Sequence, residues 1–101
     1  MIWDKKMLND FLKGKITANC KTNLSAMTFI DLLRKIKKAH NYSGGKWYQT
    51  YWDTYEKNTV YGFNDGLSFG NIKHKVMGRK YYDNAIEFTD WSIDLLQEVT
   101  K

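Results

Sequence analysis

The stretch that decides the fold of this chain reads TVYGFNDGLSFGNI and covers residues 59–72. Two runs rich in β-branched and aromatic residues, 59–63 and 67–72, flank an Asn-Asp-Gly triplet at 64–66. An Asp-Gly pair between such runs is a strong local signal for a β-hairpin, because both residues tolerate the left-handed backbone of a tight turn. We therefore predict two adjacent antiparallel strands here.

A helix and a strand are expected near the start of the chain. Asp4 is suited to cap a helix that runs to Lys13, and Gly14 is suited to end it. Residues 15–20 then alternate between polar and apolar types, which indicates a half-buried strand. The apolar residues of that strand are Ile16, Ala18 and Cys20.

A long amphipathic helix follows, with Thr22 as its expected cap and His40 as its approximate end. Its apolar residues recur at helical spacing, so one face is expected to be buried. These residues are Ala26, Phe29, Ile30, Leu33 and Ile36. The polar side of its last turns gathers Arg34, Lys35, Lys37 and Lys38. Cations at the end of a helix also suit the helix dipole, so their placement alone does not establish a binding role.

The segment after this helix has a pattern that fits more than one kind of secondary structure. Residues 41–46 contain Ser-Gly-Gly and are expected to form a loop. Trp47, Tyr51 and Tyr55 are spaced four residues apart, which fits a helix, although aromatic residues also favour strands. We predict a short helix or an irregular turn over 47–55.

Three further elements are expected downstream of the hairpin. Residues 74–83 form a connection, and 84–88 form a third antiparallel strand. Thr89 or Asp90 caps a final helix. Its inner face consists of Trp91, Leu95, Leu96 and Val99. The order α-β-α-β-β-β-α predicts a single α+β domain over residues 1–101, with an antiparallel or mixed sheet of about four strands and helices packed on it.

The composition indicates one basic globular domain. The chain has 101 residues, of which 43% are hydrophobic, and this content argues against disorder. Its net charge of +5 divides into +7 over residues 1–46 and −2 over residues 47–101. A basic half suggests a polyanionic partner, either nucleic acid or a nucleotide phosphate, whereas the plain alternative is that the charge keeps the protein in solution.

Several kinds of chemistry find no support in the sequence. One cysteine and two histidines do not make a zinc pattern, and the carboxylates are scattered, so we expect no metal and no cofactor. Cys20 lies on the apolar face of a predicted strand, which indicates a buried, inert thiol. Because no paired acid and base is evident, we expect that the protein is not an enzyme.

The sequence also carries an expectation about location. The residues MIWDKK at the N-terminus do not follow the pattern of a signal peptide. No segment approaches the roughly 18 apolar residues of a membrane span. We therefore expect a cytoplasmic protein with no membrane partner.

The aromatic segment between Tyr42 and Tyr55 is the candidate binding site. Bases stack on flat aromatic rings while lysine and arginine hold phosphates, so its combination with the preceding basic helix suits a nucleotide or a single strand. It suits a protein interface equally well. The candidate residues are Arg34, Lys35, Lys38, His40, Tyr42, Lys46, Trp47, Tyr48, Tyr51, Trp52 and Tyr55.

A purely structural role is the alternative for this segment. A domain of this size needs large residues to seal its sheet, and in that case Trp47 and Tyr51 close the core while the tyrosine hydroxyls face water. Solvent exposure of Trp47, Tyr51, Trp52 and Tyr55 distinguishes the two interpretations.

Short motifs distributed along the chain carry a resemblance. They read FLKGKI at 11–16, NCKT at 19–22, SGGK at 43–46, WD at 52–53, NTVY at 58–61 and EF at 87–88. In this arrangement the chain resembles small uncharacterised proteins of phages and prophages from low-GC Gram-positive bacteria, although its C-terminal helix is longer. The resemblance implies a phage accessory protein, a class that often acts in host takeover or in blocking host defences.

Three hypotheses follow from the residues and the resemblance together. The leading one is a non-enzymatic inhibitor of a bacterial immune system, of the anti-CRISPR type, that binds a host effector or its nucleic-acid channel. The second is sequestration of a signalling nucleotide, for which a symmetric homo-oligomer with the ligand near the interface is expected. The third is a nucleic-acid-binding accessory protein whose affinity falls steeply with salt.

Overall fold

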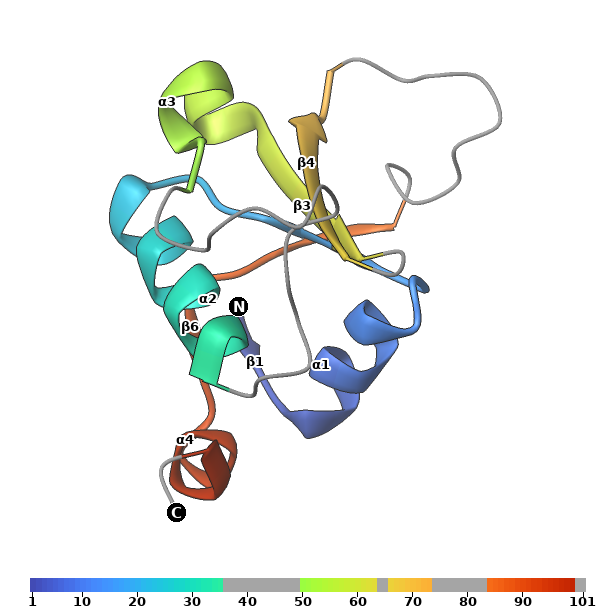
Figure 1. Ribbon diagram of the computed structural model, residues 1–101, viewed down its shortest axis with the longest axis vertical. Coiled ribbons are helices and arrows are strands. Elements are labelled where there is room, and N and C mark those ends of the chain that lie inside the picture. The colour runs from blue at the N-terminus through green and yellow to red at the C-terminus, as the bar shows by residue number, and fades with distance from the viewer. Residues whose placement is uncertain (36–49, 64–65, 74–83, 100–101) are drawn as a thin grey trace.

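The structure is a computed structural model that describes residues 1–35, 50–63, 66–73 and 84–99 (Figure 1). Its helices are α1 (Lys5–Leu12), α2 (Asn23–Lys35), α3 (Trp52–Tyr55), the 3-10 helix η1 (Glu56–Asn58) and α4 (Ile93–Val99). Its strands are β1 (Ile2–Trp3), β2 (Thr17–Asn19), β3 (Thr59–Phe63), β4 (Leu67–Asn71), β5 (Ala85–Glu87) and β6 (Asp90–Trp91). The predicted α+β class is confirmed.

The main sheet has four strands in the order β4-β3-β2-β5. The predicted hairpin is present, with Tyr61 opposite Phe69 in an antiparallel register. The prediction of a third antiparallel strand at 84–88 is wrong, because β5 pairs in parallel with β2, with Ala18 opposite Ile86. Alternation of residue types identifies a strand but does not identify its neighbour, and β5 lies against β2 rather than extending the hairpin.

Strand β2 occupies the centre of this sheet, and this position corrects a second prediction. The strand was expected to be half-buried, yet Thr17 and Asn19 are buried along with Ala18. A strand with neighbours on both edges and side chains covered on both faces leaves little backbone or side chain for water. Asn19 is therefore a buried polar residue that must find hydrogen-bond partners within the fold.

A second, two-stranded sheet was not predicted. Strands β1 and β6 pair in parallel, with Trp3 opposite Trp91. Thr89 and Asp90 therefore do not cap the final helix. Ser92 does so, since its hydroxyl oxygen accepts from the Leu95 N–H at 3.3 Å. A strand of two residues is too short for its alternation to be recognised in the sequence.

Three predicted helix ends are confirmed. The Asp4 carboxylate accepts from the Met7 N–H at 3.0 Å and caps α1. Gly14 has a φ of 76°, which is the left-handed backbone expected after the end of that helix. The Thr22 hydroxyl oxygen accepts from the Ser25 N–H at 3.0 Å and caps α2. The structure gives α2 up to Lys35, and the rest of the predicted helix lies outside the described residues.

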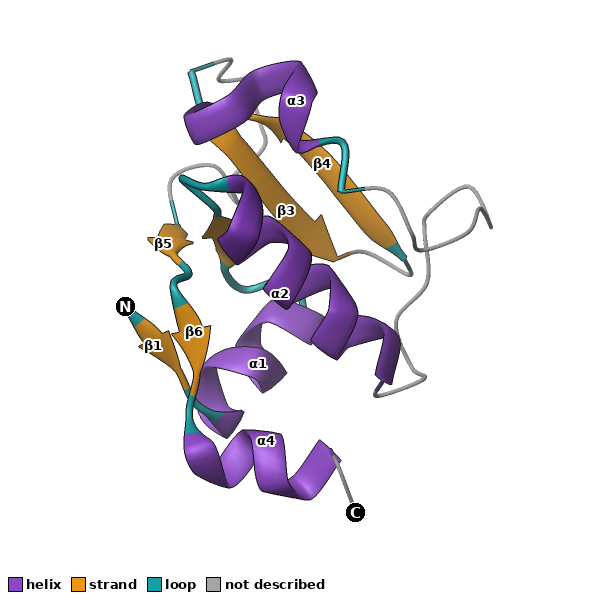
Figure 2. Ribbon diagram, turned by 90° about the vertical axis from the view of Figure 1, so that its left-hand side faces the viewer, coloured by secondary structure: helices purple, strands orange, loops and turns teal. Residues whose placement is uncertain are grey.

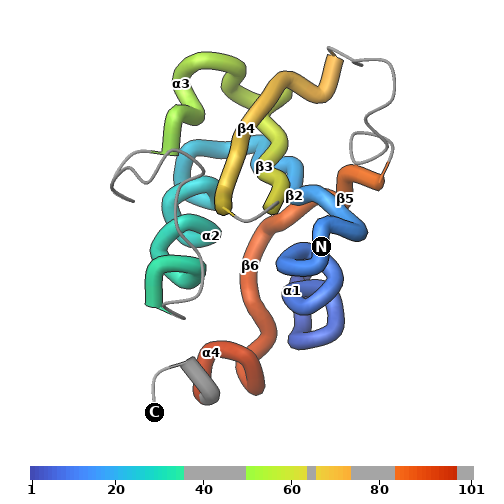
Figure 3. The backbone as a smooth tube through the Cα atoms, turned by 45° about the vertical axis from the view of Figure 1, so that its right-hand side comes forward, coloured from blue at the N-terminus to red at the C-terminus, as the bar shows by residue number. Residues whose placement is uncertain are grey.

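The core is built around the ring of Phe29 on α2. Its neighbours are aromatic rings with centroids 5.0–5.8 Å away, namely Phe88, Phe11, Trp91, Trp3 and Tyr61. Figure 3 shows β6 running between α1 and α2, which brings Trp91 against Phe29. The molecule is longest along one axis, at 40 Å, and α3 and α4 lie at its opposite ends (Figure 2).

Candidate binding site at the α3 segment

The structure describes five of the eleven candidate residues. Arg34 and Lys35 lie at the end of α2, while Tyr51, Trp52 and Tyr55 belong to the α3 region. The other candidates lie outside the described residues, namely Lys38, His40, Tyr42, Lys46, Trp47 and Tyr48.

Arg34 and Lys35 are engaged with a carboxylate on their own helix. Both side chains bind Asp31, at 2.7 and 3.2 Å, and the hydrogen bond from Arg34 is the main reason why the pKa of Asp31 is lowered. Helix α3 lies beside the beginning of α2 (Figures 1 and 2). At 1.5 Å per residue, Arg34 is roughly 16 Å along α2 from that beginning. The structure therefore does not bring Arg34 and Lys35 together with the α3 aromatics.

The α3 segment is anchored to the fold by the indole of Trp52. This N–H donates to the Cys20 carbonyl at 2.9 Å, and the half-buried ring packs against the core. The Thr59 hydroxyl reaches the Trp52 carbonyl at 3.4 Å. Trp52 thus positions the segment, and this role differs from the freely stacking ring that the sequence suggested.

Two residues that flank α3 have left-handed backbones. Tyr51 has a φ of 54°, and Glu56 has a φ of 51° with a ψ of −127°. Residues with a Cβ atom adopt such conformations at a cost of about 1–2 kcal/mol each. The rings of Tyr51 and Tyr55 at the two ends of this turn lie against Phe69 on β4.

Asn19 fixes the other end of the segment. Its side-chain amide nitrogen donates to the carbonyls of Lys57 and Thr59, at 3.1 and 2.9 Å. Since Asn19 is only 6% exposed, these bonds hold the backbone around η1 from beneath the surface. Lys57 is therefore displayed by a rigid backbone.

An exposed aromatic ledge, formed by Tyr51, Tyr55 and Phe69, runs along the outer side of this segment. The rings of Tyr51 and Phe69 stack in parallel, with centroids 4.9 Å apart and an interplanar angle of 3°. The ring of Tyr55 lies 5.9 Å from Phe69 in a tilted arrangement. Tyr51 is 45% exposed and Phe69 39% exposed, so the ledge faces solvent. This exposure argues against the interpretation that Tyr51 closes the core.

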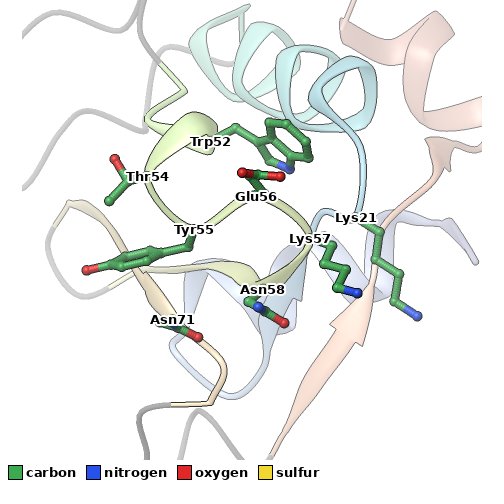
Figure 4. Close-up of a pocket in the computed structure, with 8 residues that line it drawn as sticks. All are labelled: Lys21, Trp52, Thr54, Tyr55, Glu56, Lys57, Asn58 and Asn71. Atoms are coloured by element: carbon green, nitrogen blue, oxygen red, sulfur yellow. The ribbon is translucent and has the colours of Figure 1, made fainter.

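Beside the ledge lies an open depression of about 630 Å³ at one end of the sheet (Figure 4). Two lysines and two asparagines are among its lining residues, namely Lys21, Lys57, Asn58 and Asn71. Trp52, Thr54, Tyr55 and Glu56 supply the rest of its lining. We call this the sheet-end depression, and its shared residue Tyr55 connects it to the ledge.

The two lysines at the depression differ in their ion pairing. Lys21 contacts Glu87 at 3.3 Å, yet its side chain remains 61% exposed. Lys57 has no ion pair within the part of the chain that the structure describes. Figure 4 shows both lysine side chains extending to the same side, whereas the Glu56 carboxylate lies beside the Trp52 indole. One rim of the depression is therefore cationic.

Sequence reasoning missed these residues because it could not pair β2 with β3. That antiparallel pairing sets Asn19 opposite Val60, so Lys21 after β2 continues opposite Asn58 before β3. Asn71 is the last residue of β4 and pairs with the first residue of β3, so it lies at the same end of the sheet. The predicted hairpin was the only available signal, since it placed Asn71 beside the start of β3.

Cys20 is fully buried, as predicted. Burial raises the pKa of its thiol to about 12, despite an opposing hydrogen bond with Ser25. It is therefore protonated at neutral pH and unsuited to act as a nucleophile. Among residues 1–35, 50–63, 66–73 and 84–99, no three His, Cys, Asp or Glu side chains are grouped so as to hold a metal ion.

Comparisons with known proteins identify no relative, since no family model, curated protein or solved structure matches this chain. Of the helices that the structure describes, none is both long enough and apolar enough to span a membrane.

Proposed function

We propose that this chain is a phage accessory protein that inhibits a bacterial immune system by binding, without catalysis, in the manner of an anti-CRISPR. Its target is a host defence effector or the nucleic-acid channel of that effector, and it acts in the cytoplasm of the host cell. The aromatic ledge carries this proposal, because Tyr51 and Phe69 present stacked rings to solvent at one end of the molecule.

Exposed aromatic rings supply much of the energy of protein interfaces. Tyrosine is among the residues most enriched at the positions that dominate binding energy, and a large ring buries much apolar area with few rotatable bonds. Tyr51 and Phe69 already hold each other in a stacked arrangement. A partner that covers them therefore has little side-chain freedom to remove, which favours tight binding.

The backbone of the segment supports the same role. Tyr51 and Glu56 keep left-handed conformations that glycine would adopt without a steric cost. Strain of this kind tends to occur at functional sites, where it aims particular side chains. Here it turns the ledge outward, while Trp52 is held by the Cys20 carbonyl.

The experiment is a plaquing assay in bacteria that carry one defined immune system, such as a CRISPR nuclease directed at the phage. Expression of the chain is expected to restore plaque formation. The double variant Tyr51→Ser and Phe69→Ser should restore far fewer plaques. Ile93→Ser is the matched control, since Ile93 is 71% exposed but lies on α4 at the opposite end of the molecule.

Two results would contradict the proposal. One is that phage stays fully restricted in the presence of the chain across CRISPR and other defence systems. The other is that the ledge variant and the Ile93→Ser control protect phage equally well while both accumulate as folded protein. The second result would leave inhibition intact but remove the ledge from the binding surface.

A further inference from the structure

We infer that the sheet-end depression binds the phosphate of a nucleotide unit, with Lys57 and Lys21 at the phosphate and the ring of Tyr55 against the base. The ligand is either a free nucleotide or one phosphodiester unit of a single strand, which share this chemistry. The inference deepens the proposed function and rests on it, because it names what the α3 surface recognises when it engages a defence system.

The two lysines provide the anion-binding part of the site. Lys21 follows β2 and Lys57 lies in η1 just before β3, and both side chains extend to the same side of the depression (Figure 4). Lys57 has no ion pair within the described residues, and Lys21 has only Glu87, at 3.3 Å. A phosphate bound in the depression would accept hydrogen bonds from both ammonium groups and be attracted by both charges.

The amide side chains provide a means of reading the base or sugar. Asn58 is half-buried, and its side-chain amide makes no hydrogen bond to any described residue. The side-chain oxygen of Asn71 accepts from the Lys73 N–H at 2.9 Å, which leaves its amide nitrogen to donate. Amides present both donors and acceptors, as the polar edge of a base requires.

The aromatic part of the site adjoins the lysines directly. Tyr55 lines the depression and also contacts Phe69 on the ledge, so a base against Tyr55 continues an existing group of rings. Stacking on tyrosine accepts any base and supplies affinity with little selectivity. Among the described residues that line the depression, Glu56 is the one carboxylate, and it lies beside Trp52 and apart from the two ammonium groups (Figure 4).

The dimensions favour a small ligand over an acidic peptide. A volume of about 630 Å³ falls within the range of about 300–1,000 Å³ typical of small-molecule sites. An acidic peptide would use the same lysines and its backbone could pair with Asn58, but it would cover Tyr55 only with a side chain next to the carboxylate, whereas a nucleotide always carries a flat ring beside its phosphate. The observations therefore favour the nucleotide unit, and the peptide becomes an outcome of the test.

The test is isothermal titration of the full chain with five probes at low salt: adenosine, adenosine monophosphate, a cyclic dinucleotide, a short oligothymidylate and a short acidic peptide. At least one phosphate-bearing probe should bind, and adenosine should bind much more weakly. Tight binding of the mononucleotide or cyclic dinucleotide identifies a free nucleotide as the source. Tight binding of the oligothymidylate alone identifies a single strand.

Two variants that change the affinity for the probe in opposite directions test whether it binds in the sheet-end depression. Lys57→Gln should weaken binding by about tenfold, as expected for the loss of one charge-assisted contact. Glu87→Gln should strengthen it, because Lys21 is then released from its ion pair. Lys13→Gln is the matched control and should have no effect, since this exposed lysine precedes Gly14, which lies against the far end of β3 at Phe63.

The inference is overturned if no phosphate-bearing probe binds, if Lys57→Gln binds as tightly as the parent, or if only an acidic peptide binds. Its failure is distinguishable from failure of the proposed function. Plaque restoration without nucleotide binding removes the inference and leaves the function. Nucleotide binding that depends on Lys57, without plaque restoration, removes the function and leaves the site.

Discussion

The buried amide of Asn19 is predicted to hold both the central strand and the candidate site. Its side chain is 6% exposed and donates to two carbonyls, those of Lys57 and Thr59, at 3.1 and 2.9 Å. Asn19→Ala removes both donors. The Thr59 carbonyl keeps its bond from the Cys20 N–H at 3.2 Å, whereas the Lys57 carbonyl loses the side-chain partner that ties it to β2.

The loss of stability in Asn19→Ala follows from the number of hydrogen bonds that the substitution removes. Each hydrogen bond contributes about 0.5–1.5 kcal/mol net, and truncation leaves a poorly hydrated carbonyl and a small void, so we expect a loss of about 2–3 kcal/mol in the free energy of unfolding. For a domain near 100 residues, 1 kcal/mol corresponds to about 4–8 °C, so the melting temperature should fall by about 10–20 °C. The amides around η1 should also exchange faster with solvent.

Urea denaturation followed by far-UV circular dichroism measures this loss. Asn58→Ala is the matched control, because it removes the same group from a half-buried asparagine whose amide makes no hydrogen bond to a described residue. It should change the free energy of unfolding by less than about 0.5 kcal/mol. Equal stabilities of the Asn19→Ala and Asn58→Ala variants would refute the reasoning.

Three further predictions concern the same region. Glu56→Gly should raise the free energy of unfolding by about 1 kcal/mol by relieving its left-handed backbone, whereas Glu56→Ala should not, as thermal denaturation of the pair will show. Trp52→Phe should lower it by about 1 kcal/mol through loss of the indole bond to the Cys20 carbonyl. Because burial raises the pKa of Cys20 to about 12, the unfolded thiol ionises first as pH rises. Stability should therefore fall from about pH 9 upward, and Cys20→Ala should lose less stability over that range.

Local signals in the sequence were sufficient for most of the elements. Asp4, Gly14 and Thr22 act on their immediate neighbours, so the ends of α1 and the start of α2 could be predicted from residue type alone. The hairpin was equally local. The parallel pairing of β5 with β2 and the pairing of Trp3 with Trp91 join residues that are far apart in the chain, and no local pattern encodes them.

The candidate site likewise combines a feature that the sequence predicted with residues that only the fold brings together. The exposure of Tyr51 was expected if the aromatic segment binds, and the structure shows it. Phe69, Lys57 and Lys21 were missed, because they join the site only through the register of the sheet. Arg34 and Lys35 lie at the end of α2 that is far from α3, since a helix separates in space what the sequence places close together.

The central claim is that the α3 segment is the binding surface, and amide hydrogen exchange measures this most directly. Exchange is compared for the free chain and for its complex with the effector that the plaquing assay identifies. The account predicts slower exchange at residues 51–58 and 69–71, with no change at 93–97 on α4. Unchanged exchange at 51–58 in a saturated complex, or protection confined to α4, would contradict it.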